Sequence, residues 1–258
     1  MPFPLQFSLG PARVDAHLVF ELLAFFVGFR YFLFLRKRQA DPIPDGNRVW
    51  ILIGAALGAF LGSRLLGGLE DPVAWRQAAY PLLYLFAAKT IVGGLLGGLF
   101  GVELVKKAIG ESRSSGDLFV YPLILAMIIG RIGCFGAGLS EATYGLPSDL
   151  PWAIDLGDGL PRHPVALYEI AFLALLWFSL ANVGKSATFR SGIRFQFFLI
   201  GYLVFRLLLD FLKPGFRFSF GLTSIQIACL LGLAYYSKTI FCLFFRFDAL
   251  TADHARNP

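Results

Sequence analysis

Long apolar runs constrain this chain more than any other feature of its sequence. Hydrophobic residues make up 57% of its 258 residues, and Phe alone contributes 28. Soluble domains hold roughly 45–50% apolar residues, and a helix needs about 20 apolar residues to cross a bilayer core of ~30 Å. We therefore expect an all-α integral membrane protein with about seven transmembrane helices, in residues 16–35, 49–68, 80–105, 118–139, 165–182, 193–212 and 222–245.

The distribution of Lys and Arg predicts the orientation of these helices. One set of connections holds 13 basic residues: Arg36, Lys37, Arg38, Arg48, Lys106, Lys107, Arg113, Lys185, Arg190, Arg194, Lys238, Arg246 and Arg256. The opposite set holds only 5: Arg13, Arg76, Arg162, Lys213 and Arg217. Cytoplasmic loops carry the excess of positive charge, so we expect the N-terminus outside and the C-terminus in the cytoplasm. Because the basic residues are scattered over separate loops, we expect no nucleic-acid partner.

The same pattern predicts the domain organisation. We expect residues 1–258 to form a single polytopic membrane domain, with a helical core at 16–246. An outward-facing loop at 140–164 connects the fourth and fifth spans. Residues 247–258 are predicted to form a disordered cytoplasmic tail. Nothing in the sequence demands an oligomer, so we expect a monomer.

Charged residues inside the apolar runs are the first candidates for a functional site. A charge at the bilayer centre costs ~2.5–3.5 kcal/mol on insertion scales unless it is paired or faces a wet cavity. Five cations lie within or at the ends of spans: Arg30, Arg64, Lys89, Arg131 and Arg206. The acids there are Glu21, Glu103, Glu169 and Asp210.

These acids do not balance the cations. Arg206 and Asp210 are four residues apart, so they share a helix face and can pair, and Glu21 is placed to pair with Arg30 or Arg64. An anionic ligand with a hydrophobic body, such as a phospholipid, would neutralise the remaining excess. The alternative for Arg30 and Lys89 is that each extends to the membrane surface.

Residues 130–169 interrupt the apolar pattern with GRIGCFGAGLSEATYGLPSDLPWAIDLGDGLPRHPVALYE. This stretch resembles the phosphatidylglycerol–prolipoprotein diacylglyceryl transferase family. The ordered matches are Gly130-Arg131-Ile132-Gly133, Tyr144-Gly145, Leu150-Pro151-Trp152, Arg162-His163-Pro164 and Leu167-Tyr168-Glu169. Flanking matches are Gly62-Ser63-Arg64-Leu65, Gly93-Gly94-Leu95, and Arg206 with Asp210-Phe211.

The resemblance implies an activity in the bacterial inner (cytoplasmic) membrane. Enzymes of this family transfer the diacylglyceryl group of phosphatidylglycerol to the thiol of a lipobox cysteine in preprolipoproteins, and glycerol 1-phosphate leaves. The implied partners are phosphatidylglycerol, such preprolipoproteins and the lipid bilayer, without a cofactor. The alternatives are a phospholipid-dependent transferase with a different acceptor, and a non-catalytic lipid-binding homologue.

The resemblance also implies roles for individual residues. Arg131 and Arg206 would clamp the phosphate, since a guanidinium grips two oxygens at once, and Asp210 would orient Arg206. Val92 stands where the family has a catalytic His, so Lys89, the nearest titratable group, is the candidate base. The candidate substrate-binding residues are Arg64, Gly93, Gly94, Glu141, Tyr144, Gly145, Arg162, His163, Tyr168 and Glu169.

Other features carry more than one interpretation. The glycines at 93, 94, 97, 98 and 101 predict close helix packing, with a path for a lipid tail as the alternative. His163 either caps the helix that follows it or contacts the lipid head group. Cys134 is interpreted as a small buried filler. The three His are far apart and the Cys show no CxxC spacing, so we expect no metal site.

Overall fold

The computed structural model describes residues 3–9, 12–39, 41–186 and 189–251, and in these residues it is a bundle of helices. The helices are α1 (Ala16–Arg38), α2 (Asp45–Gly68), α3 (Pro72–Gln77), α4 (Pro81–Ala87), α5 (Ile91–Ala108), α6 (Val120–Ala137), α7 (Val165–Ser186), α8 (Ile193–Leu209), α9 (Ser224–Tyr235) and α10 (Ser237–Phe245). Short 3-10 helices cover Asp117–Phe119, Gly138–Ser140, Asp210–Leu212 and Phe247–Leu250. The strands are β1 (Gln6–Leu9), β2 (Ala12–Asp15), β3 (Ile154–Asp155) and β4 (Pro161–Arg162).

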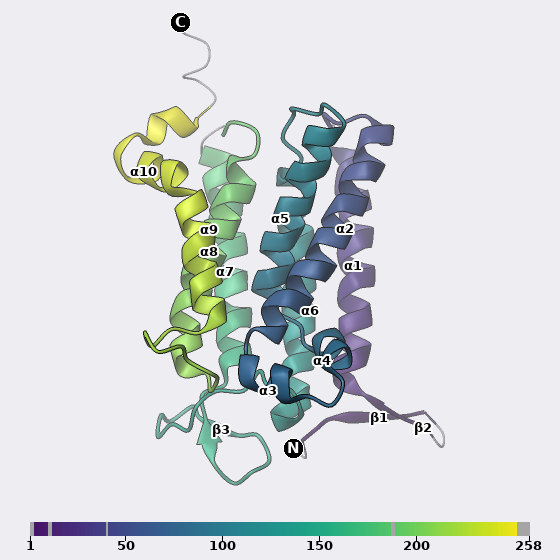
Figure 1. The fold of residues 1–258 in the computed structure, drawn as a ribbon. Helices are drawn as coiled ribbons and strands as arrows, with labels where there is room; N and C mark the ends of the chain where they lie inside the picture. Colours follow the sequence, from purple (N-terminus) through teal and green to yellow (C-terminus); the bar gives the residue numbers. More distant parts are fainter. Residues whose placement is uncertain (1–2, 10–11, 40, 187–188, 252–258) are drawn as a thin grey trace, which may run out of the picture.

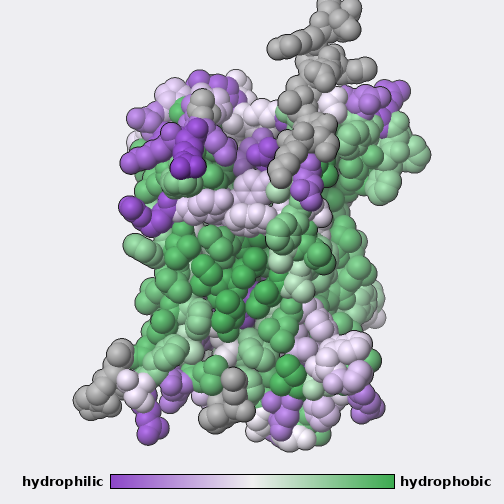
Figure 2. All heavy atoms as spheres, turned by 180° about the vertical axis from the view of Figure 1, so that it is seen from behind, coloured by the Kyte–Doolittle hydropathy of each residue, from purple (hydrophilic) through white to green (hydrophobic). Residues whose placement is uncertain are grey.

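The predicted all-α membrane protein is confirmed. Five helical segments among the described residues are long and apolar enough to cross a membrane, and two bent helix pairs raise the number to as many as seven. Their outer faces are apolar: on α1, Phe25 is 72% exposed and Leu22 is 62% exposed. The rear surface carries a hydrophobic middle zone between two hydrophilic ends (Figure 2). Such a surface fits acyl chains around the middle and water at both ends.

The two ends of the bundle carry different elements. The N-terminal hairpin β1–β2, the short helices α3 and α4 and the β3 region lie at one end, while α10 lies at the other (Figure 1). Strand β1 pairs antiparallel with β2. The backbone N–H of Leu5 donates to the carbonyl of Gly136 at 2.8 Å, which ties the hairpin to the end of α6.

Helices α2 and α5 pack backbone against backbone. A Cβ added at Gly97 would lie 2.3 Å from the carbonyl oxygen of Gly58, and one at Gly93 would lie 2.3 Å from that of Gly62. No side chain fits at such distances, so only glycine allows this approach. The predicted close packing of the glycine stripe is confirmed for these positions.

The predicted span at 80–105 is wrong in its first third. Helices α4 and α5 meet at 92°, so α4 lies across the bundle and only α5 runs along it. The cause is a set of hydrogen bonds that hydropathy does not register. The Thr90 hydroxyl accepts from the Gly93 N–H at 3.1 Å and so caps α5, while the Thr90 N–H donates to the Ser63 hydroxyl on α2 at 3.0 Å.

The predicted span at 222–245 is also broken. Helix α9 begins at a capping box formed by Thr223 and Gln226, and α10 turns away from it by 63°. The tail prediction fails for its first residues, because Phe247–Leu250 forms a 3-10 helix and Thr251 pairs with Phe189. Residues 252–258 of that predicted tail lie outside the described residues.

Candidate functional site

Two of the predicted cations meet at one carboxylate in the interior of the bundle. Arg131 on α6 places its Nε 2.9 Å from Oε1 of Glu169 on α7. Arg206 on α8 places Nη1 3.8 Å from Oε2 of the same residue. All three residues are buried. The sequence predicted both arginines as ligands of an anion, and Glu169 now occupies the position between them.

Neighbouring polar groups hold this cluster in place. The Tyr202 hydroxyl donates to Glu169 at 2.8 Å. Arg206 donates from Nη2 to Asp210 at 3.4 Å, which confirms the predicted pairing. The Thr223 hydroxyl, at the start of α9, donates to the other oxygen of Asp210. Residues from α6, α7, α8 and α9 thus converge on the two guanidinium groups, which limits their motion.

The arginine cluster keeps unused hydrogen-bonding capacity. Arg206 Nε is buried and has no hydrogen-bond partner among the described residues. Arg131 Nε is engaged in the 2.9 Å ion pair with Glu169, and its Nη1 contacts Cys134 Sγ at 3.5 Å. A buried donor without a partner costs ~1–3 kcal/mol. An anion with several oxygens, such as a phosphate, would satisfy the Arg206 donor.

The positive charge of this region extends to Lys213, directly after the 3-10 helix Asp210–Leu212. Burial lowers the pKa of Lys213 to about 8, and repulsion by the Arg206 guanidinium acts in the same direction. Burial likewise raises the pKa of the Glu70 carboxyl in the loop between α2 and α3, against the attraction of Lys213 and Arg206. Both residues were absent from the predicted site.

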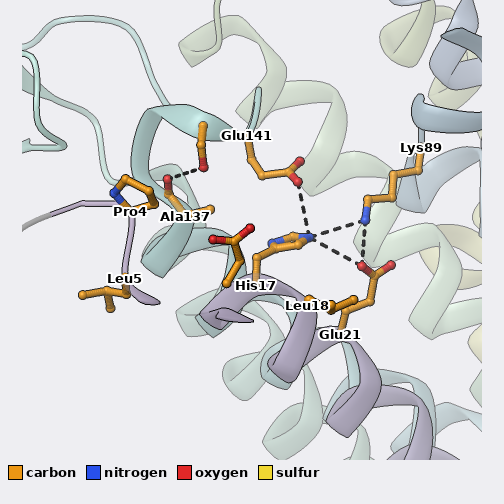
Figure 3. A pocket seen from close by; sticks show the side chains of 10 residues that line it. Pro4, Leu5, His17, Leu18, Glu21, Lys89, Ala137 and Glu141 are labelled. Atoms are coloured by element: carbon orange, nitrogen blue, oxygen red, sulfur yellow. Dashed lines mark hydrogen bonds and ion pairs between the residues drawn. The ribbon is translucent and has the colours of Figure 1, made fainter. Parts of the chain in front are cut away.

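A second polar cluster lines a cavity of about 250 Å³ beside the N-terminal hairpin. His17 and Glu21 come from α1, Lys89 from the break between α4 and α5, and Glu141 from the residue after Gly138–Ser140. Figure 3 shows the four side chains pointing toward one another. Lys89 Nζ donates to Glu21 at 2.7 Å, so Glu21 pairs with Lys89 and the predicted pairing with Arg30 or Arg64 is wrong.

Cys134 lies between the two clusters. Its Sγ is 3.5 Å from Nη1 of Arg131, and its side chain interacts electrostatically with His17. The neighbouring Gly133 brings α6 against α1, since a Cβ there would lie 3.3 Å from the His17 backbone. Cys134 therefore contacts a functional candidate on each side, and its interpretation as a small filler stays a prediction.

The predicted residues of the outer loop form a third group. Arg162 donates from Nε to Asp158 at 3.0 Å, and its guanidinium lies over the Tyr144 ring. These contacts lower the pKa of Asp158 and raise that of Arg162, in each case mainly through the hydrogen bond between the two. His163 faces the Tyr168 hydroxyl, with Nδ1 and Oη 3.3 Å apart.

The backbone of this loop is closely packed. A Cβ at Gly145 would lie 2.4 Å from the carbonyl oxygen of His163, and Arg162 donates from Nη1 to the Gly145 carbonyl at 3.3 Å. The Tyr168 hydroxyl accepts from Trp152 at 2.7 Å. The loop therefore presents a defined surface built on the start of α7.

Three further predicted residues lie on α2 and α5. Arg64 donates from Nη1 to the Ala88 carbonyl at 3.0 Å, so it supports the break that presents Lys89. Gly93 is buried in the contact with α2, whereas a Cβ at Gly94 would meet nothing closer than 3.8 Å. Among the described residues, no group of three or more His, Cys, Asp or Glu is arranged to hold a metal ion.

Comparison with known proteins identifies the family. A sequence profile described as "Prolipoprotein diacylglyceryl transferase" matches residues 4–245. The chain belongs to this family. Proteins named phosphatidylglycerol–prolipoprotein diacylglyceryl transferase from Nitratidesulfovibrio vulgaris and Methylococcus capsulatus are 32% and 31% identical to it, over 88% of this chain and 88% and 90% of their own lengths. The protein of the same name from Bordetella avium is 31% identical over 83% of this chain and 83% of its own length.

Membership in the diacylglyceryl transferase family makes the chain a transferase and confirms the resemblance seen in the sequence. Val92, where the resemblance implied a departure from the family's His, is 1% exposed and packs in the hydrophobic core with Phe198, Leu199 and Tyr202. The sequence analysis did not select His17 as a site residue. In the sequence it is a single histidine at the start of an apolar run. Its polar neighbours come from distant parts of the chain, so no local motif marked it.

Proposed function

We propose that this chain transfers the diacylglyceryl group of phosphatidylglycerol to the thiol of a lipobox cysteine in preprolipoproteins and releases glycerol 1-phosphate. The supporting observation is the pair Arg131 and Arg206, buried around one carboxylate, with the Nε of Arg206 lacking a partner among the described residues. The family and the names of its members agree with this proposal.

The chemistry requires charge stabilisation at the phosphate. The thiolate sulfur forms a bond to the glyceryl carbon that bears the phosphate oxygen, and the C–O bond breaks with its electrons going to that oxygen. A phosphate monoester forms and gains negative charge. Arg131 and Arg206 donate hydrogen bonds where this charge develops, which is the effect that most lowers such barriers. Glu169 and Asp210 position the two guanidinium groups before substrate arrives.

The arrangement in the membrane follows from charge and topology. We propose that the end with the N-terminus and residues 140–164 faces the outside of the bacterial inner membrane, and that the C-terminus is cytoplasmic. Support comes from the excess of Lys and Arg on the opposite connections and from the location of the hairpin β1–β2 and α10 at opposite ends (Figure 1).

The outer loop is the proposed contact for the polypeptide substrate. Tyr144, Gly145, Arg162, His163 and Tyr168 surround the start of α7, next to the arginine cluster. Arg64 and Gly93 hold the start of α5 against α2 and so fix the break at Lys89. No cofactor is part of the proposal, because the substrate cysteine supplies the nucleophile.

Reconstitution tests the function directly. Purified protein in phosphatidylglycerol vesicles is given a lipobox peptide, and thioether product and glycerol phosphate are quantified together. We expect equal amounts of both. Glycerol phosphate without modified peptide would overturn the proposed acceptor, and the absence of both products would leave a lipid-binding protein without this activity.

Arginine variants test the clamp. Lysine keeps the charge but loses the two-pronged geometry, so Arg131→Lys and Arg206→Lys should each lower kcat by ~10²–10³, the effect of losing one strong transition-state donor. Arg30→Lys is the matched control, since Arg30 is an exposed arginine on α1, and we expect it to keep full activity. A clamp variant with the control's rate would contradict the assignment.

A further inference from the structure

The proposed transfer requires a base that deprotonates the substrate thiol, and the arginine cluster contains no such group. A thiol is a poor nucleophile until it loses its proton, and a guanidinium is never deprotonated in proteins. A proton acceptor is needed within reach of the clamp. The following inference rests on the proposed function, because it concerns how that thiol is activated.

The cavity beside the hairpin holds a group suited to this task. His17 Nε2 faces Lys89 Nζ at 3.4 Å, Glu141 Oε1 at 3.6 Å and Glu21 Oε2 at 3.7 Å. Asp15 also lines the cavity, and Cys134 lies on the other side of the ring. The His17 side chain is 15% exposed and lines the cavity.

The other titratable groups of the cavity are engaged differently. The Lys89 ammonium donates to Glu21 at 2.7 Å, so the group predicted from sequence as the base already carries its proton in an ion pair. The carboxylates are weaker bases than imidazole near neutral pH. Imidazole is the side chain whose ordinary pKa, ~6.5, lies nearest physiological pH. Geometry and chemistry thus agree on His17.

The base is also next to the phosphate clamp. Cys134 contacts Arg131 through Sγ at 3.5 Å and interacts with His17 on its other side. The buried Nδ1 of His17 has no nitrogen or oxygen partner among the described residues, and the Cys134 thiol is the polar group that interacts with the ring from outside the cavity cluster. With the ring proton on Nδ1, the Nε2 lone pair points to the cavity. A thiol in the cavity is then one residue away from the guanidinium that holds the phosphate.

We propose that His17 is the general base of this enzyme and that the cavity receives the substrate cysteine. Nε2 takes the thiol proton while the sulfur attacks the glyceryl carbon and the C–O bond to phosphate breaks. The imidazolium then returns its proton to water or to the released phosphate. Glu21 and Glu141 face Nε2 and stabilise the imidazolium as it forms, while the Lys89 ammonium opposes it.

Substitution of His17 gives the first test. General base catalysis contributes ~10²–10⁴ to a rate, so His17→Gln should lower kcat with a cysteine peptide by about that factor. The wild-type rate should level off above pH ~7, whereas the rate of the variant should keep rising with pH as hydroxide forms the thiolate. A variant with the wild-type pH profile would overturn the proposal.

The substrate provides a test that a merely structural role cannot mimic. A selenol ionises without a base at neutral pH, so a selenocysteine peptide should restore His17→Gln to within about tenfold of wild type, the remainder of a ~10²–10⁴ base effect. An equal loss with both peptides would overturn the proposal. Leu22→Ala is the matched control on α1, because Leu22 is 62% exposed and faces away from the cavity.

The comparison with Lys89 and with the wild type completes the design. In Lys89→Met the rate should still level off at high pH, as in the wild type, since His17 remains. If the rate levels off in His17→Gln but not in Lys89→Met, the base is Lys89. If His17→Gln does not fold, imidazole added to His17→Ala tests the same point, and no rescue would count against the proposal. A wild type without product would refute the transferase function, whereas an active wild type with an equally active His17→Gln refutes only the base.

Discussion

Replacement of Glu169 by Gln should destabilise the folded protein more than any other conservative change in the site. Glu169 is the carboxylate shared by Arg131 and Arg206, and its side chain is 2% exposed. The amide keeps the size of the side chain and an oxygen for Tyr202. It removes the negative charge that two buried guanidinium groups share.

The magnitude follows from the two distances. At an effective dielectric constant of ~20, attraction at 2.9 Å is worth ~6 kcal/mol and attraction at 3.8 Å ~4 kcal/mol. Replacing the carboxylate also removes the free-energy cost of burying its charge. The net loss of stability on breaking a buried pair is therefore smaller than the summed attraction, ~3–5 kcal/mol. For a chain of this size, that corresponds to a fall of roughly 10 °C in the unfolding midpoint.

Thermal unfolding in detergent measures this loss. Glu103→Gln is the matched control, because Glu103 pairs with Lys106 but is 48% exposed, and such a pair contributes ~0–1 kcal/mol. Phosphatidylglycerol should raise the midpoint of Glu169→Gln more than that of the wild type, since its phosphate supplies the missing charge. Equal midpoints for Glu169→Gln and Glu103→Gln would refute the reasoning.

Two further predictions concern the edge of the site and its frame. A lysine with a lowered pKa is charged below that pKa and neutral above it. The KM for phosphatidylglycerol should therefore rise above pH about 8 in the wild type and stay constant with pH in Lys213→Arg. A wild-type KM that is independent of pH from 7 to 9 would exclude Lys213 from phosphatidylglycerol binding. Gly97→Ala should destabilise the protein by ~1–3 kcal/mol, because its Cβ would lie 2.3 Å from the Gly58 carbonyl oxygen. In the control Gly98→Ala, the nearest atom to the added Cβ is 3.5 Å away, so this change should be neutral or stabilising. Unfolding in urea or SDS measures both.

The sequence predicted what depends on composition and local spacing. Hydropathy located the spans because a membrane helix must be apolar along its whole length, whatever it packs against. The spacing of Arg206 and Asp210 predicted their pairing because four residues bring two side chains to one helix face. Arg131 and Glu169 were both selected, but their contact links α6 to α7 and no local rule gives it.

The parts that failed depend on contacts between distant segments. The break at Lys89 arises from hydrogen bonds between Thr90 and Ser63 on α2, and the apolar residues around it conceal the turn. The Thr at 90 was the available signal, since Thr often caps a helix. His17 acquires its surroundings from Lys89 and Glu141, which only the fold brings to it. Its role therefore could not be read from the start of α1.

The break between α4 and α5 also fixes a depth. Helix α5 is 18 residues long, about 27 Å, and it starts shortly after Lys89, which lines the cavity. The protein therefore fixes the depth in the membrane of the proposed thiol site. The lipid sets the level of the phosphate plane, through the thickness of its hydrocarbon core. The two levels coincide only for a matched bilayer. An enzyme built in this way registers membrane thickness, because a lipid in a mismatched bilayer must move its phosphate out of the phosphate plane to reach Arg131 and Arg206.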